Sequence, residues 1–189
     1  MENEKYITGY FDDMSKIISQ LDREKIDNVI NIFFNAWKNN KKIFAMGNGG
    51  SASTASHFVA DLNKTAIVEG KKRFKAVSLV DNMPLMTAWV NDASWDDVYT
   101  GQLENFIEEG DVLVGFSVHG ASGWSGNMPK AMDFAKNKGA LNVSFAGFDG
   151  GKMKEMADEC VVVPIESTPQ VEAFHVVLHH LIVFGLKEK

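Results

Sequence analysis

Cysteine is nearly missing from this chain of 189 residues, which contains a single one, Cys160. One thiol cannot form a disulfide within the chain or a zinc site built on several cysteines, and it is typical of the reducing cytoplasm. Runs of about 18 apolar residues are also missing, and the first residues lack the apolar core of a secretion signal. The sequence therefore predicts a cytoplasmic protein without a membrane-spanning segment.

An excess of positive charge is missing as well. The 19 lysines and arginines are outnumbered by 25 acidic residues, and the resulting net charge of −6 argues against nucleic acid as a partner. No repeat, linker or low-complexity segment divides the chain. With 45% hydrophobic residues, this length predicts a single globular domain over residues 1–189.

Two stretches near the N-terminus, residues 4–21 and 23–39, have the apolar spacing of amphipathic helices. The apolar stripe of the first stretch includes Tyr6, Tyr10, Ile17 and Leu21, which is more than one small domain needs. We therefore expect residues 1–40 to form helices that pack at a subunit interface, in a homotetramer or a homodimer.

Residues 41–189 alternate between short aliphatic runs and helical patterns. The runs at 43–46, 75–79, 112–117, 141–145 and 159–163 indicate strands, and the segments 52–63, 84–91, 99–106, 128–138 and 169–186 indicate helices. Buried strands that alternate with helices form a parallel sheet covered on both faces. The predicted fold class is therefore α/β: a three-layer α/β/α sandwich with a five-stranded parallel sheet, flavodoxin-like or Rossmann-like, plus extra N-terminal helices.

A glycine-rich turn, Gly47-Asn48-Gly49-Gly50, separates the first strand of this region from a helix. Ser51 follows at the position where we expect the helix N-cap. Backbone N–H groups at the start of a helix favour a bound phosphate. The turn therefore predicts phosphate binding by Asn48, Gly49, Gly50 and Ser51. It has neither the Gly-x-Gly-x-x-Gly nor the Gly-Lys-Ser/Thr pattern of nucleotide sites, so we expect no nucleotide cofactor.

His57 and Asp61 lie further along the same predicted helix. Their i, i+4 spacing places both side chains on one face. One segment therefore offers an anion site and, a short distance beyond it, two titratable groups. This arrangement is typical of an enzyme that binds a substrate by its phosphate and transfers protons elsewhere on it.

A second turn rich in hydroxyl groups follows the strand at 112–117 and contains Ser117, His119 and Ser122. Hydroxyl and backbone donors can bind phosphate without lysine or arginine. Loops at the carboxyl ends of neighbouring parallel strands share one crevice. We therefore expect the two turns to form a single phosphate-binding pocket.

The last predicted helix is mostly apolar yet contains Glu172, His175, His179 and His180. Titratable groups in a buried helix are unfavourable unless they are paired or ligated. We expect His175 to be a core histidine. On an ideal helix Glu172 and His179 nearly align, and His180 lies about 80° further round. Spacing alone thus favours His179 as the partner of Glu172.

Taken together, these blocks resemble the sugar isomerase (SIS) domain family, and within it the sedoheptulose 7-phosphate isomerases, also called phosphoheptose isomerases. The similarity extends over nearly the whole chain. The matching blocks are Gly47-Asn-Gly-Gly-Ser-Ala, His57-Phe-x-Ala-Asp61-Leu, Asn91-Asp92, Gly110-Asp-Val-Leu-Val-Gly-x-Ser, Gly147-x-Asp-Gly-Gly-Lys152-Met and the histidine-containing last helix.

The resemblance implies a ketose–aldose isomerisation of a phosphorylated sugar through an enediolate. It implies Asp61 as the base and His180, rather than His179, as the acid. Further implied are Asn91, Asp92 and Glu172 among the substrate-binding residues. The family's metal site corresponds to a set of four residues in this chain: His57, Asp61, Glu172 and His180. The resemblance implies that they hold a divalent ion, which we expect to be Zn²⁺.

Three departures from the family pattern point to a different sugar phosphate as substrate. The second turn reads Ser117-Val-His-Gly-Ala-Ser122 where the family has Ser-Thr-Ser-Gly-Asn-Ser, and extra residues follow around Trp124. Asp61 stands where the family has Glu, and Glu172 stands where it has Gln.

Two other functions remain open from the sequence. SIS domains also serve as non-catalytic phosphosugar-binding sensors, and a scaffold subunit with a decayed site would also lose the longer Glu at position 61. The titratable residues on two buried helices argue against a sensor, since a sensor needs no base.

Overall fold

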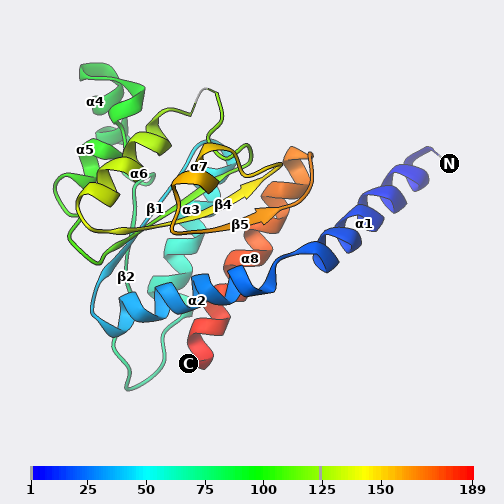
Figure 1. The fold of residues 1–189 in the computed structure, drawn as a ribbon, viewed down its shortest axis with the longest axis horizontal. Helices are drawn as coiled ribbons and strands as arrows, with labels where there is room; N and C mark the ends of the chain where they lie inside the picture. The colour runs from blue at the N-terminus through cyan, green and yellow to red at the C-terminus, as the bar shows by residue number, and fades with distance from the viewer. Residues whose placement is uncertain (1, 124) are drawn as a thin grey trace.

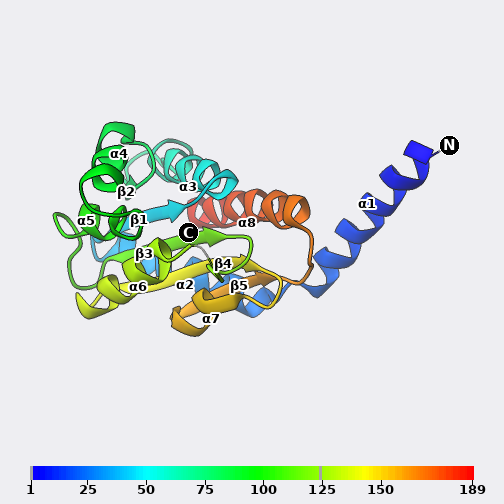
Figure 2. The same cartoon turned by 90° about the horizontal axis from the view of Figure 1, so that it is seen from above.

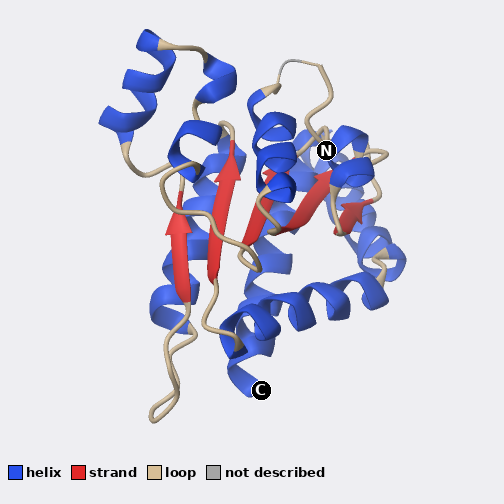
Figure 3. Cartoon of the chain, turned by 60° about the vertical axis from the view of Figure 1, so that its left-hand side comes forward, coloured by secondary structure: helices blue, strands red, loops and turns tan. Residues whose placement is uncertain are grey.

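The computed structural model describes residues 2–123 and 125–189. Its sheet contains five parallel strands in the order β2-β1-β3-β4-β5. The strands are β1 (Lys42–Gly47), β2 (Lys75–Ser78), β3 (Val112–Ser117), β4 (Leu141–Gly147) and β5 (Glu159–Val163). Figure 3 shows them pointing in one direction between layers of helices.

Eight α-helices accompany the described strands. They are α1 (Glu2–Gln20), α2 (Arg23–Lys38), α3 (Gly50–Ala60), α4 (Met83–Asp92), α5 (Thr100–Leu103), α6 (Asn127–Asn137), α7 (Gly151–Met156) and α8 (Thr168–Glu188). A π-helix, η1 (Asp61–Thr65), continues α3, and a 3₁₀-helix, η2 (Trp95–Asp97), follows α4. None of the helices formed by the described residues is long and apolar enough to cross a membrane.

Two hydrophobic cores lie on opposite faces of the sheet. On one face α2, α3 and α8 pack through residues such as Phe33, Phe58 and Phe174. On the other face α5, α6 and α7 pack through Leu103, Met128 and their neighbours. This arrangement confirms the predicted three-layer sandwich with a five-stranded parallel sheet, because the uniformly aliphatic strands are buried from both sides.

The strand order creates a crevice between β1 and β3. From β1 the chain moves outward to β2 and then returns past β1 to form β3. The loops that leave the carboxyl ends of β1 and β3 therefore diverge to opposite faces of the sheet. Ligands of open parallel sheets bind at such a point.

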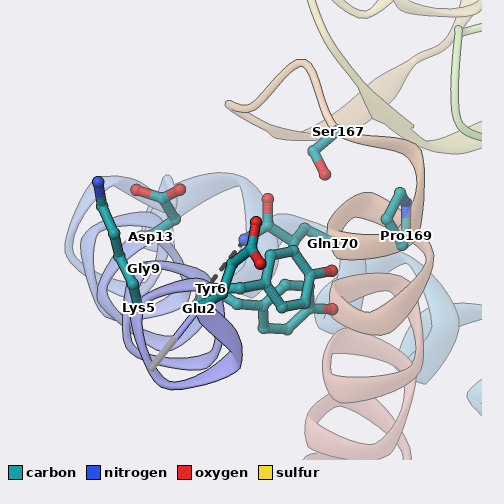
Figure 4. A pocket seen from close by; sticks show the side chains of 9 residues that line it. Glu2, Lys5, Tyr6, Gly9, Asp13, Ser167, Pro169 and Gln170 are labelled. Carbon is teal, nitrogen blue, oxygen red and sulfur yellow. Dashed lines mark hydrogen bonds between the residues drawn. The ribbon is translucent and has the colours of Figure 1, made fainter.

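Helix α1 extends away from the rest of the molecule (Figures 1 and 2). Ile17, near its end, is buried, whereas Tyr6 and Phe11 are 71% and 62% exposed. Gln170 of α8 donates a hydrogen bond to the Tyr10 carbonyl at 3.3 Å. A cavity of about 500 Å³, shown in Figure 4, separates the two helices beside this contact. Within one chain Tyr6 of the predicted apolar stripe is thus exposed, Tyr10 and Leu21 are partly buried and Ile17 is buried.

Candidate active site

A cleft of about 390 Å³ lies at the carboxyl ends of β1 and β3, beside the start of α8. It brings together the predicted phosphate-binding residues of both turns, together with Glu172. Its lining residues are Asn48, Gly49, Gly50, Ser51, Trp95, Phe116, Ser117, Val118, His119, Ser122, Ser125, Thr168 and Glu172. The two turns therefore line one pocket, as expected, and the phosphate ligand of that pocket stays a prediction.

The turn after β1 depends on glycine at two positions. Gly49 has a φ of +58° and is the N-cap of α3. A Cβ on Gly47 would lie 2.4 Å from the Ser51 carbonyl oxygen, which is too close for any side chain. The expected N-cap, Ser51, is instead the second residue of α3, because the positive φ of Gly49 starts the helix two residues earlier. The Ser51 side chain is buried where it lines the cleft.

Asn48 is held by other side chains. Its Nδ2 donates to Asn127 Oδ1, and Asn127 Nδ2 donates back to Asn48 Oδ1, both at 3.0 Å. The Tyr99 hydroxyl donates to Asn48 Oδ1 at 2.9 Å and to the Gly47 carbonyl. Burial raises the pKa of Tyr99, so it remains a donor. These bonds fix the turn against the start of α6.

Glu172 lies against the beginning of α3. A Cβ on Gly50 would be 2.3 Å from Glu172 Oε1, so any larger residue there would displace the Glu172 carboxylate. The carboxylate thus occupies the positive end of the α3 dipole, where negative charge is stabilised. This contact also sets α8 alongside α3.

A second constellation lies about two helical turns further along α3 and α8, roughly 10 Å from the cleft. His57, Asp61, His179 and His180 offer ligand atoms that all lie within 4.8 Å of one another. Asp61 Oδ2 is 3.3 Å from His180 Nε2, 3.5 Å from His57 Nε2 and 3.9 Å from His179 Nδ1. The two Nε2 atoms of His57 and His180 are 3.4 Å apart.

Asp61 begins the π-helix that replaces the end of the predicted helix 52–63. Its carbonyl accepts the Ala66 N–H at 2.9 Å, which is the wider turn of a π-helix. The Thr65 hydroxyl donates to Asp61 Oδ1 at 2.8 Å. Oδ1 is thereby held, and Oδ2 faces the three imidazoles.

The electrostatics of this cluster favour a cation. Asp61 Oδ2 and both ring nitrogens of His179 are buried without a hydrogen-bond partner among the described residues. Burial, and then the neighbouring His180 and His57, lower the pKa of His179 to about 4, so its ring is neutral at pH 7. Neutral imidazoles and one carboxylate are ligands that Zn²⁺ prefers. The residues therefore fit a divalent metal.

The cluster differs from the predicted ligand set in one member. His57, Asp61 and His180 come together as expected, and His179 joins them. Glu172 is not part of the cluster, since it lies at the cleft. Both His179 and His180 lie beside Asp61, with their ring centroids 4.2 Å apart, and the assignment of the acid role to His180 stays a prediction.

The predicted sugar-binding pair Asn91 and Asp92 lies outside the cleft. Asn91 Nδ2 donates to Asp92 Oδ1 at 2.7 Å, and both residues line a separate concave surface on α4. Trp95 lines both this surface and the cleft, and no sequence pattern indicated it. Thr65 was also missed, because it contributes only through the π-helix. The predicted insertion around Trp124 is centred on a residue outside the described ones.

Comparison with known proteins supports the resemblance. The SIS domain family matches residues 9–147. The lincomycin biosynthesis protein LmbN of Streptomyces lincolnensis is 37% identical over 181 residues, which cover 92% of this chain and 66% of LmbN. The phosphoheptose isomerase of Helicobacter pylori strain P12 is 36% identical over 85% of this chain and 81% of its own length. The structure of phosphoheptose isomerase GmhA from Neisseria gonorrhoeae superposes with a TM-score of 0.89 and 26% identity, over 98% of this chain and 99% of that one.

Proposed function

The chain belongs to the SIS domain family, and we propose that it interconverts a phosphorylated ketose and aldose, as the related phosphoheptose isomerases are named for doing. One observation is central to this proposal. The cleft, suited to phosphate, and the cluster of titratable residues lie on the same two helices, α3 and α8. A substrate bound by its phosphate in the cleft can therefore extend along these two helices, so that its reacting carbons reach the cluster.

The separation between the two regions suits an open-chain sugar. Two helical turns correspond to roughly 10 Å. With C–C bonds of about 1.5 Å in a zigzag, a phosphorylated chain of roughly six or seven carbons extends over this distance. The phosphate would be bound by hydroxyl donors such as Ser51, Ser117 and Ser122. Asn91 and Asp92, which line the separate surface on α4, are not assigned a contact along this path.

We assign the proton transfers to two residues of the cluster. Asp61, through Oδ2, would take the proton from the carbon next to the carbonyl group and return it to the neighbouring carbon. His180, 3.3 Å away, would move a proton between the two oxygens. Thr65 would keep the carboxylate oriented by its bond to Oδ1.

His57, Asp61, His179 and His180 would hold a divalent ion, for which we propose zinc. When bound, such an ion supplies Lewis-acid stabilisation of negative charge on the reacting oxygens. Asp61 and His180 thus have two proposed roles, as ligand and as proton carrier, which would alternate, because a lone pair that binds the ion cannot accept a proton at the same time. Glu172, which lines the same cleft, would accept hydrogen bonds from hydroxyl groups of the substrate rather than contact its phosphate, which carries the same sign of charge.

We also propose that the protein is a homo-oligomer, a tetramer or a dimer. Val177, Leu181 and Phe184 of α8 are about half exposed and flank His180 on the helix surface. The exposed apolar residues of α1 are available to cover such a surface in a second copy. Covering α8 would shield the cluster from water, which limits side reactions of an enediolate.

The test is isomerisation of phosphorylated sugars of five to seven carbons in D₂O. The abstracted proton resides on Asp61 before it returns to carbon, and part of it exchanges with solvent there, so NMR should detect deuterium at C1 or C2 in a fraction of the product. The matched control is Asp61→Asn, which should show no deuterium incorporation. Tight binding of a sugar phosphate without turnover or exchange would contradict the proposal and indicate a phosphosugar sensor.

A further inference from the structure

We propose that Phe148 is a positioning residue, which holds the imidazole of His119 at the phosphate end of the cleft. This inference rests on the proposed binding of a phosphorylated ligand there. Phe148 belongs to neither of the two turns that form the cleft. It follows β4 and reaches the cleft only through His119.

His119 is chemically distinct within the cleft. Lysine and arginine do not occur among the described lining residues, where His119 is the one side chain that can become positively charged. The acidic lining residue is Glu172. An imidazole can also donate a hydrogen bond to a phosphate oxygen when neutral. The position of this ring therefore determines how strongly the cleft attracts a phosphate.

The ring of Phe148 contacts that imidazole directly. The two ring centroids are 4.4 Å apart with an interplanar angle of 48°. Phe148 is partly buried against the core formed by α2, α3 and α8, and its N–H donates to the Ile165 carbonyl at 3.3 Å. The phenyl ring is therefore anchored, and it restricts the orientation of a side chain that would otherwise rotate over the cleft.

Backbone strain is concentrated at this contact. Phe148 has a φ of +55° and Ala121, two residues after His119, has a φ of +58°. The other described non-glycine residue with positive φ is Asn40, a residue type that tolerates this conformation. A bulky residue keeps a left-handed backbone only where its surroundings enforce it, and such residues gather at functional sites.

Backbone hydrogen bonds connect the loop that contains His119 to the segment that contains Phe148. The Gly147 N–H donates to the Val118 carbonyl at 2.9 Å, and the Met153 N–H donates to the Gly120 carbonyl at 3.0 Å. A Cβ on Gly151 would lie 2.6 Å from the His119 carbonyl oxygen. Because the main chain of His119 is fixed, the direction of its ring depends on its χ angles, and hence on Phe148.

The experiment measures inorganic phosphate binding to the full chain by NMR of the backbone amides of the cleft turns, which remain as reporters in every variant. Phe148→Leu, which keeps apolar volume but removes the ring, should raise the phosphate Kd about tenfold, as should His119→Asn. Phe148→Tyr, which keeps the ring, should restore binding close to that of the wild type. The double variant should bind no more weakly than His119→Asn alone, because Phe148 acts through His119.

The kinetic counterpart is a higher KM for a sugar phosphate at nearly unchanged kcat in Phe148→Leu. Additive effects in the double variant, or unchanged phosphate binding in either single variant, would overturn the inference. Phosphate binding that follows the expected pattern in a protein without isomerase activity would support the positioning role and contradict only the proposed reaction.

Discussion

Asp61 Oδ2 faces His180 Nε2 at 3.3 Å, while Asp61 Oδ1 accepts a hydrogen bond from the Thr65 hydroxyl at 2.8 Å. The two oxygens of one carboxylate thus have separate tasks. One is held by the π-helix, and the other is presented to imidazoles on α8. A carboxylate fixed in this way is oriented before any substrate binds, which is what proton transfer from carbon requires.

Replacing Asp61 by Asn should abolish isomerisation, because the amide keeps the shape of the carboxylate but cannot accept a proton. Phosphate affinity should remain nearly unchanged, since the cleft is roughly 10 Å away. Thr65→Val is the matched milder variant and should lower kcat by removing a hydrogen bond to a charged group, worth about 1.5–3 kcal/mol. Steady-state kinetics and phosphate inhibition measure both effects. Full activity of Asp61→Asn would show that another residue is the base, and His180 would be the next residue to test.

The phosphate cleft can be tested at Ser51 and Ser122, one from each turn. Ser51→Ala and Ser122→Ala should each weaken substrate binding by about 1.5–3 kcal/mol. The phosphate does not change during the reaction, so the loss should raise KM more than it lowers kcat. Ser15→Ala on α1 is the control, because that exposed hydroxyl donates to the Phe11 carbonyl of its own helix and does not line the cleft. An unaltered KM in both site variants would exclude these turns from phosphate binding.

A divalent metal should copurify with the protein at about one ion per chain. Elemental analysis should find it, and the double variant His57→Ala, His180→Ala should lose it. Metal affinity should weaken as the pH falls, because imidazole must be deprotonated to bind. A wild-type protein that contains no metal and whose activity does not change with chelator would contradict this prediction. The cluster would then act as an acid–base pair without an ion.

The alternation of aliphatic runs and helical patterns was enough to predict the sheet, its parallel direction and its covering helices. The π-helix could not be predicted, because Asp61 to Thr65 has the same apolar spacing as an ordinary helix end. What separates the two is the pair of local bonds that Asp61 accepts, from Ala66 and Thr65. These bonds depend on individual side chains and on local backbone geometry, which the periodicity of apolar residues does not encode.

The family resemblance grouped His57, Asp61 and His180. Helical spacing alone could not show that α8 lies alongside α3 and runs in the same direction. That packing brings both His179 and His180 to Asp61. It leaves Glu172, seven residues before His179, roughly 10 Å away beside Gly50.

His175 should make stability depend on pH. Burial lowers its pKa to about 4, from an unfolded value near 6.5. Below pH 6.5 the unfolded chain binds a proton that the folded chain does not, so stability present above pH 6.5 is lost as the pH falls toward 4. The slope is roughly 1.4 kcal/mol per pH unit for one group.

The variant His175→Leu should flatten this dependence in the metal-free protein, since it removes the group that titrates. Urea unfolding at pH 7 and pH 5, with chelator present, measures the difference. The ring lies beside the stacked rings of Phe116 and Phe145, so an apolar replacement is compatible with its surroundings. An identical loss of stability between these pH values in the wild type and the variant would show that His175 does not contribute.

The last prediction concerns assembly. Phe11 on α1 is 62% exposed on a helix that extends from the molecule, and exposed apolar surface of this kind marks an interaction site. Light scattering should give a mass that is a multiple of 20.9 kDa. Phe11→Glu should lower that mass, and it should also lower turnover, because the apolar surface around His180 would lose its cover. Phe106→Glu is the matched control, since Phe106 is 55% exposed and follows α5 at the far end of the molecule from α1. A wild-type mass of 20.9 kDa at micromolar concentration would contradict the prediction, and the cluster would then have to work while open to solvent.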